Sequence, residues 1–282
     1  MCRLIVSLGS IATAKKYYNA LLDSLYKASR YDPYSLALFG PGHESHRDGW
    51  GRIFIRIGDG DVEVDYQRST RPIYVEWPTL DLGYGGDESA LYVDIVHSRE
   101  HSSGMPVNIL STHPFETETS CEYNLYLVHN GAVNKAKLLD LLGVDPESKA
   151  AKIHNDTYFL AKYLARRICG SFNISVLRSL AGIVEAALNI GAILVTDEYV
   201  EVLVGSYYKL GYNPEASRDF YKMYRGEVDD LTVYLSSTLV DVGEYNPGLP
   251  IEWVELSNGQ YDVYRIWVGD EAIEKIGSYK II

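Results

Sequence analysis

The second residue of the chain is a cysteine, and this position gives a cysteine unusual chemistry. A small second residue generally permits removal of Met1, which would leave a thiol and an α-amine together on Cys2. A thiol of pKa about 8.5 is only a few per cent ionised at neutral pH, whereas an α-amine of pKa about 8 can accept its proton. Cys2 could therefore supply both a nucleophile and its base, although a small residue could also follow Met1 by chance.

Five short polar motifs follow Cys2 in the first 160 residues. Two of them also have a purely structural interpretation, because Asn-Gly is a strong turn signal and an aspartate in the first turn of a helix stabilises it. The motifs are His46-Arg47-Asp48-Gly49-Trp50-Gly51, His97-Ser98-Arg99 with Ser102 and Gly104, Thr112-His113-Pro114-Phe115, His129-Asn130-Gly131, and Asn155-Asp156-Thr157.

In this order after a terminal cysteine, the motifs resemble those of the class II glutamine amidotransferases, which are N-terminal-nucleophile hydrolases. The resemblance extends from Cys2 to about residue 160, with a weaker match at Ser236-Ser237-Thr238-Leu239. It implies an α+β fold, a four-layer αββα sandwich. It also implies hydrolysis of the glutamine side-chain amide through a Cys2 thioester, with release of ammonia and glutamate.

The resemblance assigns catalytic roles to three residues. Cys2 would attack the amide, and its freed amine would be the base. The side chain of Asn130 and the backbone of Gly131 would donate hydrogen bonds to the tetrahedral oxyanion. No cofactor and no metal are implied.

Substrate binding would fall to three further residues. Arg99 would hold the substrate carboxylate with its two-pronged guanidinium, Ser102 would assist, and Asp156 would bind the substrate ammonium. His46, Trp50 and His113 would shape the pocket.

One residue departs from the family pattern. Aromatic residues often follow the arginine in the family, but Glu100 stands here and could compete for Arg99 or change the amide that is preferred. We therefore keep two alternative functions, hydrolysis of γ-glutamyl peptide amides by the same mechanism and a catalytically silent amino-acid-binding module.

A zinc protease pattern, His-x-x-Glu-His, also fits residues 97–101. Two histidines one helical turn apart would bind the metal, and the glutamate would activate water. That mechanism needs a helix, but residues 91–96 are rich in β-branched side chains and residues 102–106 contain Gly and Pro, so we expect a strand and reject the zinc site.

Hydrophobic periodicity predicts the elements that position these motifs. We expect strands at residues 3–8, 50–57, 62–66, 91–96, 125–128, 192–196, 200–204, 231–236, 251–256 and 261–267. We expect helices after Ser10, at 135–142, at 157–169 with Asn155 as cap, and at 174–188. Both the His97 and the His129 motifs then lie where strands end. No Pro/Gly/Ser-rich linker interrupts the chain, so we predict one domain over 1–282, with 206–226 as a surface elaboration.

Composition limits the partners. The 26 basic and 38 acidic residues give a net charge of −12, which disfavours nucleic acid and anionic membranes. No secretory signal or membrane span is evident. The substrate would be glutamine or a γ-glutamyl amide, and any ammonia acceptor would be on a partner protein, because the hydrolase fold takes up essentially the whole chain.

Cysteine usage bears on location. Three cysteines, far apart and odd in number, argue against disulfides, so we expect a reducing cytoplasm. Only two glutamines and three methionines stand against 24 tyrosines, a composition that hints at a hot habitat.

Overall fold

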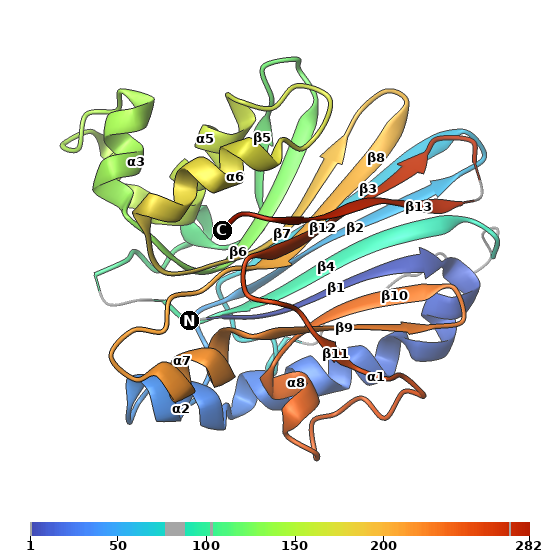
Figure 1. Cartoon of the computed structure of the whole chain (residues 1–282), viewed down its shortest axis with the longest axis horizontal. Helices are drawn as coiled ribbons and strands as arrows, with labels where there is room; N and C mark the ends of the chain where they lie inside the picture. The colour runs from blue at the N-terminus through green and yellow to red at the C-terminus, as the bar shows by residue number, and fades with distance from the viewer. Residues whose placement is uncertain (1, 77–87, 102–103, 271) are drawn as a thin grey trace.

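The computed structural model describes residues 2–76, 88–101, 104–270 and 272–282. Two antiparallel sheets lie face to face, and helices cover the outer face of each, so the chain is a four-layer αββα sandwich (Figure 1). The predicted fold class is therefore confirmed. No helix in the described ranges is long and apolar enough to cross a membrane.

The first sheet has seven strands and begins the chain. Strand β1 lies near its middle, between β10 and β4, so the N-terminal residues are held on both sides. In sheet order the strands are β11 (Val254–Glu255), β9 (Met223–Val228), β10 (Leu231–Ser236), β1 (Cys2–Ser10), β4 (Leu91–Arg99), β2 (Trp50–Gly58) and β3 (Asp61–Ser69).

The second sheet has six strands, all from the chain after residue 114. Its order is β13 (Ile273–Lys280), β12 (Gln260–Trp267), β8 (Tyr199–Ser206), β7 (Val184–Val195), β6 (Asn124–Val133) and β5 (Phe115–Glu118).

Most of the helices begin at a residue whose side-chain oxygen caps the first turn. Ser10 caps α1, Asp32 caps α2 and Asn155 caps α5, each by accepting backbone N–H bonds. The helices are α1 (Ile11–Arg30), α2 (Pro33–Phe39), α3 (Lys135–Leu142), α4 (Lys149–Ile153), α5 (Asp156–Ala165), α6 (Ile174–Leu180), α7 (Pro214–Tyr221) and α8 (Thr238–Asp241), with 3₁₀ turns at Ile109–Ser111 and Ala181–Ile183.

Strand alternation separates the buried apolar side chains into layers. Along β1, Leu4, Val6 and Leu8 pack between the two sheets, whereas Ile5 packs against α1. The third layer of core lies between the second sheet and helices α3, α5 and α6. Burial of this surface on both faces of each sheet is the main stabilising contribution.

Several predicted boundaries are wrong. The expected helix at 174–188 ends at Leu180, and β7 begins at Val184, because residues 184–195 pair with β6 along most of its length. The strands predicted at 91–96 and 125–128 continue to Arg99 and Val133. The His97 and His129 motifs therefore lie inside strands. A strand at His97 also confirms our rejection of the zinc pattern.

The cysteine expectation is also wrong. Cys121 and Cys169 form a disulfide across 48 residues, and the buried Cys2 is the free cysteine among the described residues. Separation in the sequence does not keep the two cysteines apart. The turn between β5 and β6, which carries Cys121, folds against the end of α5, where the Ser120 N–H donates to the Ala165 carbonyl.

Residues 206–226 include α7, which contacts α2. Leu210 and Tyr212 are exposed, whereas Phe220 and Tyr221 are buried in a small cluster with Tyr208.

Candidate active site

The nucleophile candidate lies at the start of β1, in register with Arg99 at the end of β4. Cys2 has the same strand parity as Leu4 and Val6, so its side chain lies on the face between the sheets, at their edge. The two residues are therefore neighbours across one strand pair, although 97 positions separate them in the sequence.

Asn130 reaches Cys2 from the opposite sheet. The main-chain nitrogen of Cys2 donates to the Asn130 Oδ1 (3.1 Å), and this bond joins β1 to β6. The Asn130 Nδ2 is buried and has no hydrogen-bond partner among the described residues. An unsatisfied buried donor is costly, so this group is available to a ligand or a reacting group.

Gly131 follows Asn130 at a crowded point of β6. A Cβ at this position would overlap the backbone of Ala187 on the neighbouring strand β7 and approach the His129 ring. Only glycine fits here, so the Asn-Gly pair is explained by close strand packing and not by a turn.

Asp156 occupies the first turn of α5, directly after the capping Asn155. Its carboxylate accepts the backbone N–H of Val133 (3.0 Å) at the end of β6. The helix is thereby tied to the strand that carries Asn130 and Gly131.

The Arg99 guanidinium is oriented by backbone carbonyls. Its Nη2 donates to the Pro106 carbonyl (2.9 Å), and its Nη1 makes a longer bond to the Asp48 carbonyl (3.4 Å). Because a guanidinium carries five N–H groups, these bonds leave donors for a carboxylate.

With the exception of Asn130, these residues line one small cavity that is partly open to solvent. Cys2 is 6% exposed at its wall. The lining residues are Cys2, Arg99, Glu100, His101, Met105, His113, His129, Gly131, Asn155, Asp156 and Thr157. Nucleophile, cation and carboxylate therefore face a common space that suits a small zwitterion better than a large ligand.

Burial controls the charge state of the thiol. Desolvation raises the pKa of Cys2 above its ordinary value, and the nearby Arg99 guanidinium opposes this shift. The thiol at rest is therefore mostly protonated at neutral pH, and efficient attack requires a base at hand.

A hydrogen-bonded histidine pair backs the cavity. Asn155 donates from Nδ2 to His113 Nε2 (3.3 Å), and its Oδ1 accepts the Tyr158 N–H, which fixes the amide orientation. His113 must then donate from Nδ1 to His97 Nε2 (3.1 Å). Burial lowers the pKa of both histidines well below the ordinary value, so this wall is neutral.

His46 and Trp50 lie outside the described lining of the cavity. Trp50 packs toward α1 and donates from Nε1 to Glu76 (3.2 Å). His46 Nε2 bonds the buried carboxylate of Asp32 (2.8 Å). Ser102, the assisting hydroxyl predicted from the sequence, lies outside the described residues, as does Met1.

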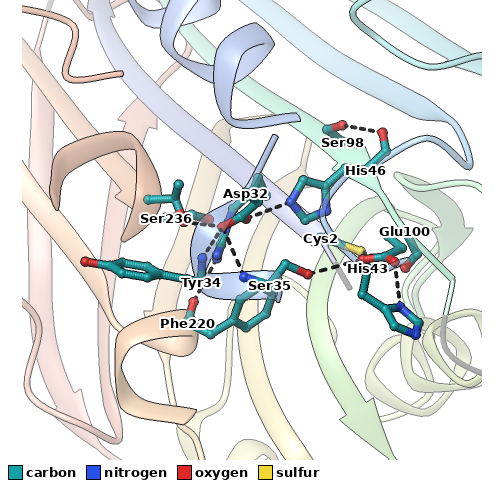
Figure 2. Close-up of polar contacts among 12 residues, drawn as sticks. Cys2, Asp32, Tyr34, Ser35, His43, His46, Ser98, Glu100, Phe220 and Ser236 are labelled. Carbon is teal, nitrogen blue, oxygen red and sulfur yellow. Dashed lines mark hydrogen bonds and ion pairs between the residues drawn. The ribbon is translucent and has the colours of Figure 1, made fainter. Parts of the chain in front are cut away.

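Asp32 is the centre of a buried polar network beside the cavity (Figure 2). It accepts from Arg3 Nε (2.5 Å) and Thr238 Oγ1 (2.9 Å), as well as from the N-terminal amides of α2. Ser236, in the same segment as Thr238, accepts the Leu4 N–H (3.0 Å). The weak sequence match at residues 236–239 is thus explained by contacts that hold the start of β1.

Sequence reasoning missed this network. Asp followed by Pro is a helix start signal, so the sequence does identify Asp32 as the cap of α2. Nothing in the sequence indicates that Arg3 and His46 are its partners.

We predict that Asp32→Asn lowers the free energy of unfolding by about 3–5 kcal/mol, because it leaves the fully buried Arg3 without a counter-charge. The Arg3 guanidinium and the His46 hydrogen bond outweigh desolvation and lower the pKa of Asp32. Its stabilising contribution is therefore present above the unfolded-state pKa of about 3.9 and is lost as the pH falls through the lower folded-state pKa.

Urea unfolding at pH 7 measures this effect. The control is Asp23→Asn, which removes an exposed carboxylate paired with Lys27 and should cost less than about 1 kcal/mol. Equal small losses in the two variants would contradict the structural role of Asp32.

Glu100 does not compete for Arg99. Its carboxylate turns toward His43 Nδ1 (2.7 Å) and the Ser35 hydroxyl (3.3 Å), while its backbone carbonyl accepts from the Cys2 thiol (3.8 Å).

Comparison of the chain with solved structures identifies its fold. No protein-family model and no curated protein matches the sequence. Among solved structures, the chain is similar to a glutamine phosphoribosylpyrophosphate amidotransferase from B. subtilis complexed with ADP and GMP (TM-score 0.54) and to the allosteric regulatory enzyme of purine biosynthesis (TM-score 0.52). The chain has the fold of the class II glutamine amidotransferases.

The amidotransferase fold is shared at low identity. Each of these two structures is 15% identical to the chain, and each match covers 99% of this chain but 49% of the other. The chain thus spans about half the length of the amidotransferase structures that it matches.

Proposed function

We propose that this chain hydrolyses the side-chain amide of glutamine through a thioester on Cys2 and releases ammonia and glutamate. The observation that carries the proposal is the convergence of Cys2, Arg99, Gly131 and Asp156 on one cavity, with the unsatisfied Asn130 Nδ2 beside them. The shared fold supports it.

The mechanism follows from these positions. After removal of Met1, the α-amine of Cys2 takes the thiol proton, and the sulfur attacks the amide carbon to form a tetrahedral oxyanion. Asn130 holds the Cys2 nitrogen through Oδ1, and its Nδ2 would donate to the oxyanion together with the Gly131 N–H. The C–N bond breaks, ammonia leaves with the proton, and water hydrolyses the thioester to glutamate.

Substrate orientation would come from opposite charges. Arg99 would bind the α-carboxylate of glutamine and Asp156 its ammonium, because these two charged side chains line the same cavity. Two charge-assisted contacts fix the amide relative to the thiol and account for the proximity effect that the mechanism needs.

We predict that Arg99→Lys raises the KM for glutamine about tenfold to a hundredfold with a smaller change in kcat. A lysine ammonium cannot replace the two parallel N–H donors with which a guanidinium binds a carboxylate. Steady-state kinetics with ammonia detection checks this, and circular dichroism confirms that the variant is folded. An unchanged KM would mean that another residue binds the carboxylate.

Hydrolysis of a γ-glutamyl amide is the second candidate, and the position of Glu100 in the cavity wall favours it. A substrate screen that reads released amine separates it from the glutaminase activity. A protein that binds glutamine but releases neither ammonia nor glutamate, despite a free Cys2 terminus, would instead be an amino-acid-binding module.

Transfer of the ammonia would require an acceptor on a partner protein or on additional chain. Location in the cytoplasm is still a prediction. Because Cys121 and Cys169 form a disulfide, cysteine usage no longer supports it. Intracellular proteins of hyperthermophiles are the known exception to the absence of cytosolic disulfides, and the composition hints at a hot habitat. Cell fractionation tests the location.

A further inference from the structure

A second pocket lies where α3, α4 and α5 meet the edge strand β5. Figure 1 shows α3 and α5 over the outer face of the second sheet. The volume of the pocket is about 370 Å³, which is in the usual range for small-molecule sites. The lining residues are Thr117, Glu118, Leu142, Val144, Ala150, Tyr158, Phe159, Lys162, Ala165 and Arg166. No described residue lines both this pocket and the candidate active site.

Much of the pocket wall is apolar. Leu142, Phe159 and Ala165 are buried, and Val144 and Ala150 are partly buried beside them. All of these except Ala150 pack in the core between the second sheet and its helices, so the wall is a well-ordered surface. An apolar group placed against this wall would leave water, which favours binding.

Two cationic side chains of α5 are held at the same wall. Lys162 Nζ donates to Thr117 Oγ1 (2.8 Å), and Arg166 Nη1 donates to the Leu142 carbonyl (2.8 Å). Both acceptors belong to residues that line the pocket, so these bonds fix the charged ends beside it. Side chains four positions apart on a helix also share one face.

Neither cation forms an ion pair with a carboxylate in the described ranges; both bond only to neutral oxygens. The chain has 38 acidic and 26 basic residues, so the missing partner does not reflect a shortage of carboxylates. Cations in the last turn of a helix also interact with its dipole, but this interaction does not account for an apolar pocket beside them.

Glu118 is the acidic residue of the lining. It follows Thr117 on β5, and strand alternation directs its side chain to the face opposite that of Thr117. Glu118 is exposed and is not paired with Lys162 or Arg166 in the described structure. The pocket therefore combines an apolar wall with two positive charges that no protein carboxylate neutralises.

We propose that this pocket binds a small organic carboxylate with an apolar body, of the arylalkanoate class. The carboxylate accepts hydrogen bonds from Lys162 and Arg166, because a guanidinium has five N–H groups and the Leu142 carbonyl takes only one of them. The apolar body lies against Leu142, Val144 and Phe159. This site goes beyond the proposed function, since it uses neither Cys2 nor Arg99.

A matched pair of ligands tests the role of charge. The acid is 4-phenylbutanoate, and the neutral partner is the alcohol with the same apolar body, 4-phenylbutan-1-ol. For the wild-type protein at pH 7 we expect the acid to bind about tenfold to a hundredfold more tightly in an NMR-detected titration. Equal affinities for the acid and the alcohol, or acid binding that does not saturate, would overturn the proposal.

Two double variants separate the local cations from the field of the whole protein. Lys162→Gln with Arg166→Gln should reduce the affinity ratio to about one. The control, Lys137→Gln with Lys149→Gln, removes two exposed lysines of α3 and α4 that lie outside the lining, and should keep the full preference. Survival of the preference in the first variant, or its loss in the control, would contradict the assignment.

Two single variants locate the bound ligand. Arg99→Gln removes the cation of the candidate active site and should leave the affinity for the acid unchanged. Ala150→Leu places a larger side chain in the pocket while both cations remain, and should weaken binding of acid and alcohol at least about tenfold. Thermal unfolding checks that each variant is folded. Loss of acid binding in Arg99→Gln, or full binding in Ala150→Leu, would place the ligand elsewhere and refute this site.

Discussion

Cys2→Ala is expected to abolish amide hydrolysis, with a loss of at least about four powers of ten in kcat, because no other thiol among the described residues faces the cavity. The α-amine would remain in this variant, but an amine without its nucleophile has no proton to accept. Ammonia release measured against wild-type protein tests the prediction.

The fold should survive this substitution. The change removes one sulfur atom from a buried strand end, and the hydrogen bond from the Cys2 main-chain nitrogen to Asn130 persists in alanine. Glutamine binding measured by calorimetry should therefore remain near the wild-type value. Replacement of the disulfide pair, Cys121→Ser with Cys169→Ser, is the matched control and should retain turnover at 25 °C. Full activity in Cys2→Ala would remove this residue from the mechanism.

Asn130→Ala is expected to lower kcat by about two to three powers of ten with a modest effect on KM. Loss of one oxyanion donor typically costs about 3–4 kcal/mol of transition-state stabilisation, and the Nδ2 group is the donor left unsatisfied in the described structure. Because the ground-state amide is neutral, the donor acts mainly in the transition state.

A second variant separates donation from positioning. Asn130→Asp keeps an oxygen that can accept from the Cys2 nitrogen but has no N–H to donate, so its kcat should be as low as that of the alanine variant. Steady-state kinetics of both variants reads the outcome. A rise in KM with unchanged kcat in both would contradict an oxyanion role.

The sequence predicted the candidate site better than it predicted the elements around it. Motif order predicts Cys2, Arg99, Gly131 and Asp156 as site residues, and the structure brings all four to one cavity. Pairing across β1 and β4 explains why, since Cys2 and Arg99 are cross-strand partners. The roles of these residues are still predictions.

Tertiary pairing explains most of the wrong boundaries. Residues 184–188 have a helical pattern, but strand pairing with β6 places them in the second sheet, buries Val184, Ala187 and Leu188, and overrides local propensity. Polar residues such as His97 and His129 suggested strand ends, yet they lie in strands, where His97 Nε2 bonds His113 and both ring nitrogens of His129 bond buried groups.

Sequence patterns do not predict the long-range polar contacts. Asp32 and Arg3 are 29 positions apart, and Cys121 and Cys169 are 48 apart, and no periodicity links either pair. Both contacts join segments that only the tertiary fold brings together.

The most direct test is to label the native protein with a glutamine analogue that carries an electrophilic diazoketone in place of the carboxamide, followed by intact-mass and peptide mass spectrometry. The account predicts one adduct per active chain, on the sulfur of a terminal Cys2, with Met1 absent and ammonia release lost in step with labelling. Active protein that retains Met1, or inactivation by an adduct at any other residue, would contradict it.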